Sequence, residues 1–412
     1  MRFTEAAKAA ALLAVLLLAY IYFSSAPQAV PTIVYKRLKF EARSYVMNMG
    51  DSVWSDLNNT ILHSLLHEQY LFLNSSDQTC TIEEAAINGN ATPYKVQEDD
   101  YGNPYLNFTL SKPFTLKPGE VVYVRIVLVV DINRKDKITD SLLNQAGLLS
   151  DIPEDVKAEY PTLNASPSFQ AENLSAIYAL AYSLRDPNGK VLDTITNILK
   201  WFEENIRYRS IKLEPQLPSE LLSRKAGDCD DQILLFIELC RALGIPARLC
   251  IGAIYTPGSE DRSSYYSLIN YTYINVGWHA WAEVLLPLAN GSLVWVPVDL
   301  TYFLGLKETP ERRLVSEDPL NHIKGAAVLW TSAMVAARLS PDEYINESRG
   351  FIKELNQTGL HWKEVQLVTE MEMPPLEVQV HWGQATMLLA LALAPLVAFA
   401  VMVARSRREL KS

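Results

Sequence analysis

The segment from Ala226 to Leu243 constrains the fold most, because its pattern predicts a helix that is buried on most sides. A glycine-led turn, Ala226-Gly227-Asp228, precedes a run of helix formers from Asp230 to Leu243. The apolar side chains in this run are Ile233, Leu234, Phe236, Ile237, Leu239, Cys240 and Leu243. We therefore predict a largely buried helix that carries Cys229 in its first turn.

Cys229 is a candidate thiolate nucleophile at this position. The unpaired N–H groups and the dipole at a helix N-terminus favour an anion, so they favour the ionised form of a thiol. The neighbouring aspartates, Asp228, Asp230 and Asp231, oppose ionisation because they place negative charge nearby. The same residues suit a helix start, with Asp228 as the predicted N-cap.

A predicted β-hairpin supplies two partners for the cysteine. Residues 278–286 and 293–300 have strand patterns and are joined by a turn at 287–292. An antiparallel register that pairs His279 with Asp299 places both side chains on one face. The aspartate would fix the imidazole tautomer and leave the other ring nitrogen to accept the thiol proton. Each residue alone is commonly a packing or turn residue, so the prediction depends on their joint occurrence.

Several stretches resemble the core of the transglutaminase-like superfamily. They are RKAGDCDD at 224–231, RALGIPAR at 241–248, WHAWAEV at 278–284, WVPVDLT at 295–301 and the preceding helix at 201–208. The resemblance covers roughly residues 191–304. It implies a papain-like α+β core in which Cys229 is the nucleophile, His279 the base and Asp299 its orienter. Membrane-anchored prokaryotic members, archaeal ones included, often carry a β-sandwich before this core.

The resemblance implies chemistry on peptide or glutamine-type amides through a thioester, ending in hydrolysis, deamidation or transfer to an amine. No cofactor and no metal are expected, since the calcium-binding pattern of the animal cross-linking enzymes is not evident. The Cys229 backbone N–H is expected in the oxyanion hole, and no second donor is identified. The alternative is a non-catalytic binding or assembly module at the cell surface on the same fold.

Two apolar runs predict the topology. Residues 6–23 suit a signal peptide or, given their length, a retained anchor, and residues 385–404 suit a transmembrane helix followed by a basic tail. Positive charges lie at the start of the first run and after the second run. Both chain ends are therefore predicted to be cytoplasmic, and the residues between the runs extracytoplasmic. The net charge of −10 and pI near 5.3 argue against a nucleic-acid partner.

Glycosylation signals agree with that topology. The sequence Asn-x-Ser/Thr begins at Asn58, Asn74, Asn90, Asn107, Asn164, Asn173, Asn270, Asn290, Asn346 and Asn356. All of them lie between the two apolar runs, which predicts a glycoprotein facing away from the cytoplasm. The expected partners are a protein or peptide substrate at the cell surface and the membrane itself.

The predicted domain order follows from these patterns. It is an anchor or signal peptide (1–29), a β-rich sandwich-like domain (30–140), a linker (141–170), the transglutaminase-like core (171–304), a helical and strand extension or stalk (305–384), a transmembrane helix (385–404) and a basic tail (405–412). Helices are predicted at 174–184, 191–205, 319–339 and 342–355, a strand at 362–382, and a loop-rich stretch at 75–103.

The remaining cysteines and histidines are assigned no chemistry. Cys240 and Cys250 are predicted to be either two buried thiols or a disulfide. His63 and His67 have helical spacing without a metalloprotease pattern, and His322, His361 and His381 have no companions at metal-ligand spacing. All five histidines are predicted to be structural.

Overall fold

The computed structural model describes residues 36–372 except 56–67, 111–113, 135–137, 167, 168, 170–173, 211–213, 266 and 304. These residues belong to one unit of the chain, Ile33–Glu372. The apolar runs at 6–23 and 385–404, and His63, His67 and His381, lie outside the described residues. Across the described part, the helices are too short or too polar to cross a membrane.

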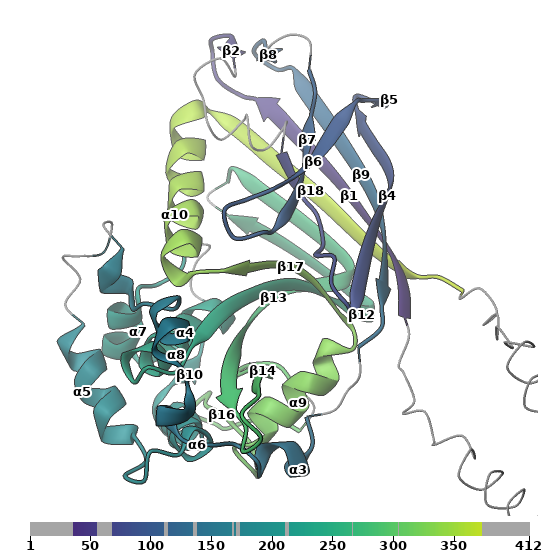
Figure 1. Ribbon diagram of the computed structural model, residues 1–412. Helices are drawn as coiled ribbons and strands as arrows, with labels where there is room; N and C mark the ends of the chain where they lie inside the picture. Colours follow the sequence, from purple (N-terminus) through teal and green to yellow (C-terminus); the bar gives the residue numbers. More distant parts are fainter. Residues whose placement is uncertain are drawn as a thin grey trace, which may run out of the picture. The chain divides into compact units, whose positions relative to one another are not determined.

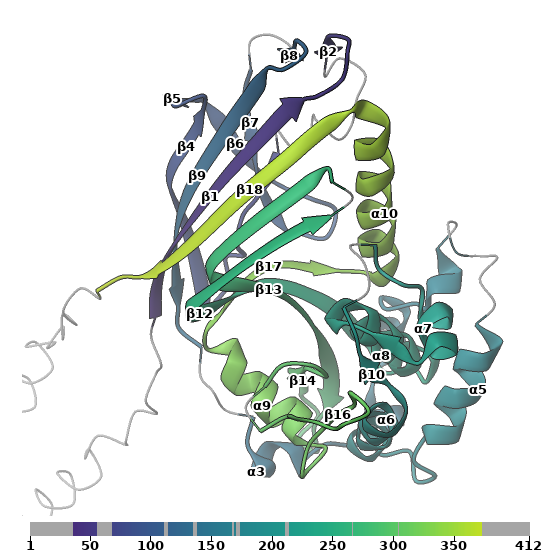
Figure 2. The same ribbon diagram turned by 180° about the vertical axis from the view of Figure 1, so that it is seen from behind.

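A mixed sheet organises the described part of the chain, in the order β17-β12-β13-β18-β1-β9-β4-β5, with β14 also paired to β13 (Figures 1 and 2). Its strands are β1 (Lys36–Asn48), β4 (Gln78–Ile87), β5 (Asn90–Ala91), β9 (Val121–Ile132), β12 (Ala247–Tyr265), β13 (Ile269–Pro287), β14 (Leu293–Val298), β17 (Ala333–Leu339) and β18 (Leu360–Glu370). Within this sheet β13 and β18 run parallel, whereas the other neighbours run antiparallel.

Strand β13 joins the two parts of this sheet. Its first residues, 269–274, pair with β18, and its last residues, 282–287, pair with β14. Because β18 also pairs with β1, strands from residues 30–140, 171–304 and 305–384 share one sheet. The continuous backbone ladder means that the three segments stabilise each other through main-chain hydrogen bonds.

Four smaller sheets accompany the large one among the described residues. They pair β3 (Glu68–Tyr70), β7 (Pro104–Phe108) and β6 (Tyr94–Glu98), β2 (Trp54–Ser55) with β8 (Thr115–Leu116), β10 (Arg207–Tyr208) with β11 (Ala226–Gly227), and β15 (Lys307–Glu308) with β16 (Leu314–Val315). The prediction of a loop-rich stretch at 75–103 is wrong, because β4, β5 and β6 lie there. Cross-strand pairing with β9 and β7 outweighs the low strand propensity of these polar residues.

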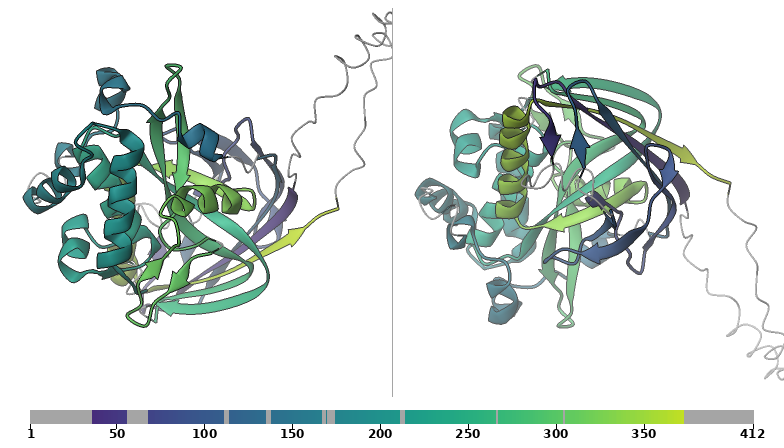
Figure 3. Two further views of the ribbon diagram at one scale, coloured as in Figure 1. Left: turned by 90° about the horizontal axis from the view of Figure 1, so that it is seen from below. Right: turned by 90° about the horizontal axis from the view of Figure 1, so that it is seen from above.

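The helices between residues 154 and 242 gather on one side of the long strands β12 and β13, and the helix at residues 321–330 lies on the other side, where Leu329 and Trp330 pack with Ile254 and Trp281 (Figures 1 and 3). The described helices are α3 (Asp140–Leu143), α4 (Glu154–Ala158), α5 (Ser175–Leu184), α6 (Val191–Asn205), α7 (Pro218–Arg224), α8 (Cys229–Ala242), α9 (Asn321–Trp330) and α10 (Pro341–Thr358). The helices predicted at 174–184, 191–205 and 342–355 are confirmed, with small shifts at their ends. Helix α8 packs against both strands and against α5, α6 and α7.

The predicted helix at 319–339 is wrong in its second half. Only residues 321–330 are helical, as α9, and residues 333–339 form β17 at the edge of the sheet beside β12. The sequence Ala-Met-Val-Ala-Ala-Arg-Leu has good helix propensity, but pairing with the long free edge of β12 and burial of nearly every side chain outweigh it.

The buried helix α8 is the centre of one hydrophobic core. Residues Ile233 to Cys240 are buried without a break, so the helix has no solvent face over two turns. Apolar side chains from α5, α6, β12, β13 and β14 complete this core. Cys240 and Cys250 are free and fully buried in the structure, so of the two alternatives the structure has the buried thiols.

Candidate active site

The first turn of α8 presents Cys229. Asp228 is the N-cap, as predicted, and Cys229 is the first helical residue with a partly exposed side chain. Gly227 allows this close turn: a Cβ atom there would lie 2.7 Å from Cβ of Asp231 and 2.8 Å from Cδ1 of Leu221. Only glycine fits so near to the helix that follows, which explains why the glycine precedes the cysteine.

Buried hydrogen bonds fix this turn. Asp231 accepts bonds from the backbone N–H of Gln216 at 2.6 Å and from its side-chain Nε2 at 2.5 Å. Nε2 of Gln216 also donates to the carbonyl of Ala226, and Nε2 of Gln232 donates to that of Gly227. Because buried polar groups without partners are costly, this network holds the backbone that carries Cys229 in one conformation.

The structure brings His279 and Asp299 together, but in a different register from the one predicted. Strands β13 and β14 pair Ala282 with Val298, so Asp299 follows the end of β14 and lies diagonal to His279. The register differs by two residues and keeps both side chains on one face of the sheet. Nε2 of His279 lies 2.6 Å from Oδ2 of Asp299.

Backbone donors hold the other carboxylate oxygen of Asp299. Its Oδ1 accepts hydrogen bonds from the N–H groups of Thr301 at 2.9 Å and Tyr302 at 3.0 Å. The side chain is only 1% exposed. The two N–H groups fix the position of the carboxyl group, so Oδ2 of Asp299 is oriented to accept a hydrogen bond from His279.

The side chain of Cys229 lies near enough to His279 to affect the ionisation of the imidazole. Because Asp299 occupies Nε2, the nitrogen left for the thiol is Nδ1. Burial by itself would lower the pKa of His279, but the charge and hydrogen bond of Asp299, together with Cys229, raise it to about 10. The imidazole is therefore suited to hold a proton taken from the thiol.

The aspartates beside Cys229 are not equal. Burial, together with the neighbouring carboxylate of Asp230, raises the pKa of Asp228 far above its usual value. Burial and the charge of Asp230 also raise the pKa of Asp231. The predicted opposition of these residues to a thiolate is therefore reduced.

The same three aspartates are the metal-ligand group found in the described part of the chain. The possible ligand oxygens of Asp228, Asp230 and Asp231 lie within 4.8 Å of one another. Asp231 is already held by Gln216, and Asp230 accepts a bond from the hydroxyl of Tyr344 at 2.8 Å. Carboxylate oxygens of this kind suit a hard cation such as calcium, and the expectation of no metal stays a prediction.

The two tryptophans that flank His279 are packing residues. Trp281 is 4% exposed, and its ring lies 6.3 Å from that of His279. Trp278 donates a hydrogen bond from Nε1 to Gln366 and stacks on Phe72. The exposed aromatic ring beside the histidine is Tyr302, which meets it edge-on at 5.7 Å.

Tertiary structure brings to the site two residues to which the sequence patterns assigned no role. Strand β10 pairs Tyr208 with Gly227, two residues before Cys229. Burial, followed by the electrostatic effect of Cys229, raises the pKa of Tyr208 to about 12, so its phenol keeps its proton. Tyr344 reaches the site from α10, more than one hundred residues away in sequence. No local sequence pattern predicts either contact.

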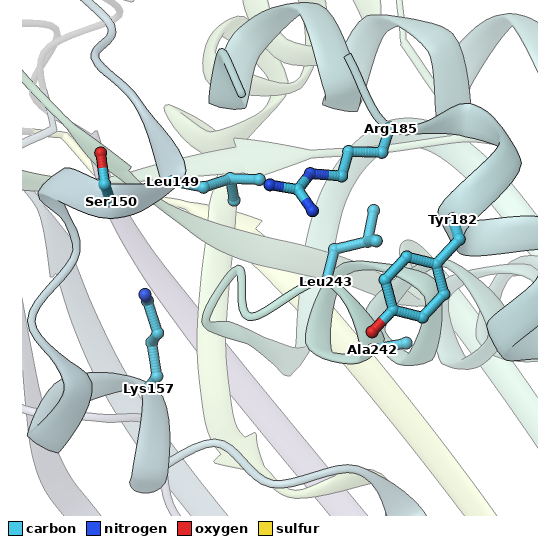
Figure 4. A pocket seen from close by; sticks show the side chains of 7 residues that line it. All are labelled: Leu149, Ser150, Lys157, Tyr182, Arg185, Ala242 and Leu243. Atoms are coloured by element: carbon cyan, nitrogen blue, oxygen red, sulfur yellow. The ribbon is translucent and has the colours of Figure 1, made fainter. Parts of the chain in front are cut away.

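A cavity of about 270 Å³ lies at the other end of α8 (Figure 4). Its lining includes Ala242 and Leu243 at the C-terminal end of the helix, with Tyr182, Arg185 and Lys157 around them. Cys229 begins the same helix thirteen residues earlier. This cavity is therefore separate from the candidate active site.

Comparison with known proteins agrees with the sequence resemblance. Residues 178–300 match the profile of the transglutaminase-like superfamily. This range contains Cys229, His279 and Asp299 and ends directly after Asp299. A search of curated proteins found no match.

Three solved structures show similarity at low sequence identity. A candidate cysteine protease from Cytophaga hutchinsonii is 16% identical, with 82% of this chain and 94% of that chain covered and a TM-score of 0.44. LapG from Legionella pneumophila is 14% identical, with 49% and 96% covered and a TM-score of 0.26. A candidate protease from Parabacteroides distasonis is 11% identical, with 62% and 63% covered and a TM-score of 0.22.

Proposed function

We propose that this chain, whose residues 178–300 form a transglutaminase-like superfamily domain, is a cysteine-dependent enzyme that acts on peptide or glutamine-type amides through a thioester. The observation that carries the proposal is the connected set of three side chains. Cys229 at a helix N-terminus interacts with His279, and Nε2 of His279 lies 2.6 Å from Oδ2 of the buried Asp299. A nucleophile, a base and an orienting carboxylate in this order match covalent acyl transfer.

In the first half of the reaction, His279 takes the thiol proton and Sγ of Cys229 attacks the amide carbonyl carbon. A C–S bond forms while the carbonyl π electrons move to oxygen. The backbone N–H of Cys229, free at the first turn of the helix, is placed to stabilise that oxyanion. As the carbonyl re-forms, the C–N bond breaks, and the leaving amine takes the proton from His279.

In the second half, water or a primary amine attacks the thioester carbon and gives its proton to His279. The C–S bond breaks, and the proton returns to the Cys229 thiolate. Water yields a carboxylic acid, by peptide hydrolysis or glutamine deamidation, whereas an amine yields a new amide. Asp299 fixes the ring so that one nitrogen serves both proton transfers.

The proposed location is the extracytoplasmic side of a membrane, with the two apolar runs as anchors. Support comes from the sequence topology and from the exposure of the glycosylation asparagines. Asn74, Asn90, Asn270, Asn290, Asn346 and Asn356 are exposed, and Asn107 and Asn164 are partly exposed. Asn270 and Asn290 lie within the range of the core, and an exposed side chain can carry a glycan there.

Intact-mass analysis of glutamine-containing peptides, incubated with the purified full chain, tests the proposal. We expect cleavage, a deamidation shift or, with a primary amine present, an amine adduct. The same change must vanish with Cys229→Ala. Unchanged peptides with both proteins would reject the enzyme and favour a binding or assembly module on the same fold.

Thiol labelling separates these two functions without a known substrate. Burial raises the pKa of the Cys240 and Cys250 thiols well above the usual value, so neither is expected to react with iodoacetamide at neutral pH. Selective labelling of Cys229 is expected for the enzyme. If Cys229 is as inert as the two buried cysteines, the binding module is the better assignment.

A further inference from the structure

His322 lies directly behind the candidate active site and touches its backbone. It is the second residue of α9, is 1% exposed, and lies outside the range that matches the superfamily profile. Nδ1 of His322 is 2.7 Å from the carbonyl oxygen of Asp299, and the N–H of Asp299 donates to the carbonyl of His322 at 2.9 Å. Two bonds therefore clamp the main chain of Asp299 to α9.

The other side of the ring faces a carboxylate from a third element. Nε2 of His322 is 2.9 Å from Oε1 of Glu203 on α6. The same oxygen accepts a bond from the N–H of Ser316 at 2.9 Å, and the ring of Phe303 meets His322 edge-on at 4.9 Å. Glu203, His322 and Asp299 thus link α6, α9 and the end of β14.

The partner atoms decide which hydrogen bonds the ring of His322 can make. A carbonyl oxygen only accepts, so Nδ1 of His322 must carry hydrogen to bond Asp299. A carboxylate facing Nε2 also only accepts, unless the carboxyl group is itself protonated. Nδ1 of His322 is therefore the donor to the carbonyl of Asp299, and Nε2 faces the carboxyl group of Glu203.

We infer that His322 and Glu203 are positioning residues that hold Asp299 in place for His279. The inference rests on the proposed function, because it assigns them a role in the same reaction. Asp299 lies beyond the end of β14, so the strand ladder no longer fixes its backbone. The clamp from His322 replaces that ladder, and Glu203 fixes the orientation of the imidazole, as partners of orienting groups do in other polar sites.

Two variants of His322 separate the two bonds. His322→Asn places an amide N–H near the position of Nδ1 and can keep the bond to the Asp299 carbonyl. The longer side chain of His322→Gln places its amide near the position of Nε2. It can therefore keep the bond to Glu203, but it leaves the carbonyl of Asp299 without a side-chain donor. Glu203→Gln keeps an acceptor but removes the charge. His361→Gln, in β18, is the histidine control.

The readout is the rate at which iodoacetate modifies Cys229 in the full chain, measured from pH 5 to pH 11, with the site confirmed by peptide mapping. Iodoacetate is an anion, so it reacts faster while His279 is an imidazolium, and the rate falls as that proton is lost. Thermal unfolding of each variant shows that it is folded. A residue that only supports the fold would change the unfolding temperature and leave the pH profile in place.

The alkaline limb is the part of the profile in which the labelling rate falls as pH rises. We expect His322→Gln to move this limb to lower pH by about one unit, and Glu203→Gln to move it less in the same direction. His322→Asn and His361→Gln should leave it near the wild-type position. Equal profiles for His322→Gln and wild type, or equal shifts for the Asn and Gln variants, would overturn the inference. If His322→Gln does not fold, Glu203→Gln decides: an unchanged limb in that variant overturns it.

The outcome is separate from that of the peptide assay. If the alkaline limb shifts in His322→Gln but the wild-type protein modifies no peptide, the proposed function is rejected and the positioning role of His322 is kept. If the wild-type protein modifies peptides but the alkaline limb is the same in the His322 and Glu203 variants, the proposed function is kept and the positioning role is rejected. A wild-type profile without any limb would reject both.

Discussion

Asp299 reaches His279 diagonally across two strands, with Oδ2 of the aspartate 2.6 Å from Nε2 of the histidine. The residue directly opposite Asp299 in the extended β13–β14 register would be Trp281. Because Asp299 lies past the end of β14, its backbone turns and donors from Thr301 and Tyr302 can hold its carboxylate. Orientation at the site thus depends on the chain after the strand as well as on the hairpin.

Asp299→Asn should leave the fold intact and remove most of the activity. An amide can donate to Nε2 of His279 and so favour the wrong tautomer, an effect that lowers turnover by about 10⁴ in serine proteases. We expect a loss of at least about a hundredfold in the rate of peptide modification. Asp318→Asn, which changes a partly exposed residue paired with Lys324 in the same region, is the control and should retain activity. Comparable rates for Asp299→Asn and wild type would contradict the assigned role.

The charge on His279 should make stability depend on pH. Its pKa in the folded protein, about 10, lies above the ordinary value of 6.5. A raised pKa stabilises the fold fully below about 6.5, and this contribution disappears as pH rises through about 10. The free energy of unfolding, measured with urea at pH 6, 8 and 10, should fall more steeply in wild type than in His279→Gln. Parallel curves for the two proteins would show that the pair does not contribute.

Gly227→Ala should destabilise the protein because the added Cβ has no room. The new atom would lie 2.7 Å from Cβ of Asp231 and 2.8 Å from Cδ1 of Leu221. Overpacking of this kind costs about 1–3 kcal/mol, and labelling of Cys229 should change with the turn. Gly350→Ala is the matched control, since it lies inside α10 with open space around its Cβ position, and it should stabilise by up to about 1 kcal/mol. Equal unfolding midpoints for the two variants would contradict this packing argument.

Tyr344→Phe tests whether α10 tunes the electrostatics around Cys229. The variant removes the hydroxyl that donates to Asp230 at 2.8 Å and leaves the ring in place. Without that donor, the dipole of the hydroxyl no longer offsets the charge of Asp230, so this charge acts more strongly on the neighbouring thiol. We expect iodoacetamide to label Cys229 more slowly at neutral pH, by about two- to tenfold. Tyr182→Phe, at an exposed position on α5, is the control and should label as wild type does.

Local patterns were enough to predict several elements from the sequence. The apolar run after Asp228 is long enough and continuous enough to predict a buried helix, and α8 begins at Cys229 with Asp228 as its N-cap. Periodicity also predicted α6 and α10 nearly to their ends. The resemblance to the superfamily selected Cys229, His279 and Asp299, and the structure brings these three together.

Tertiary structure alone decided the features that depend on distant pairing. The β13–β14 register differs by two residues from the predicted one, since the sequence pattern has a period of two and tolerates that shift. Residues 333–339 form a strand because they pair with the edge of β12. His322, Glu203 and Tyr344 reach the site from α9, α6 and α10, and their neighbours exist only after the chain has folded. Local propensity contains no information about such contacts, because their partners lie 23 to 119 residues away.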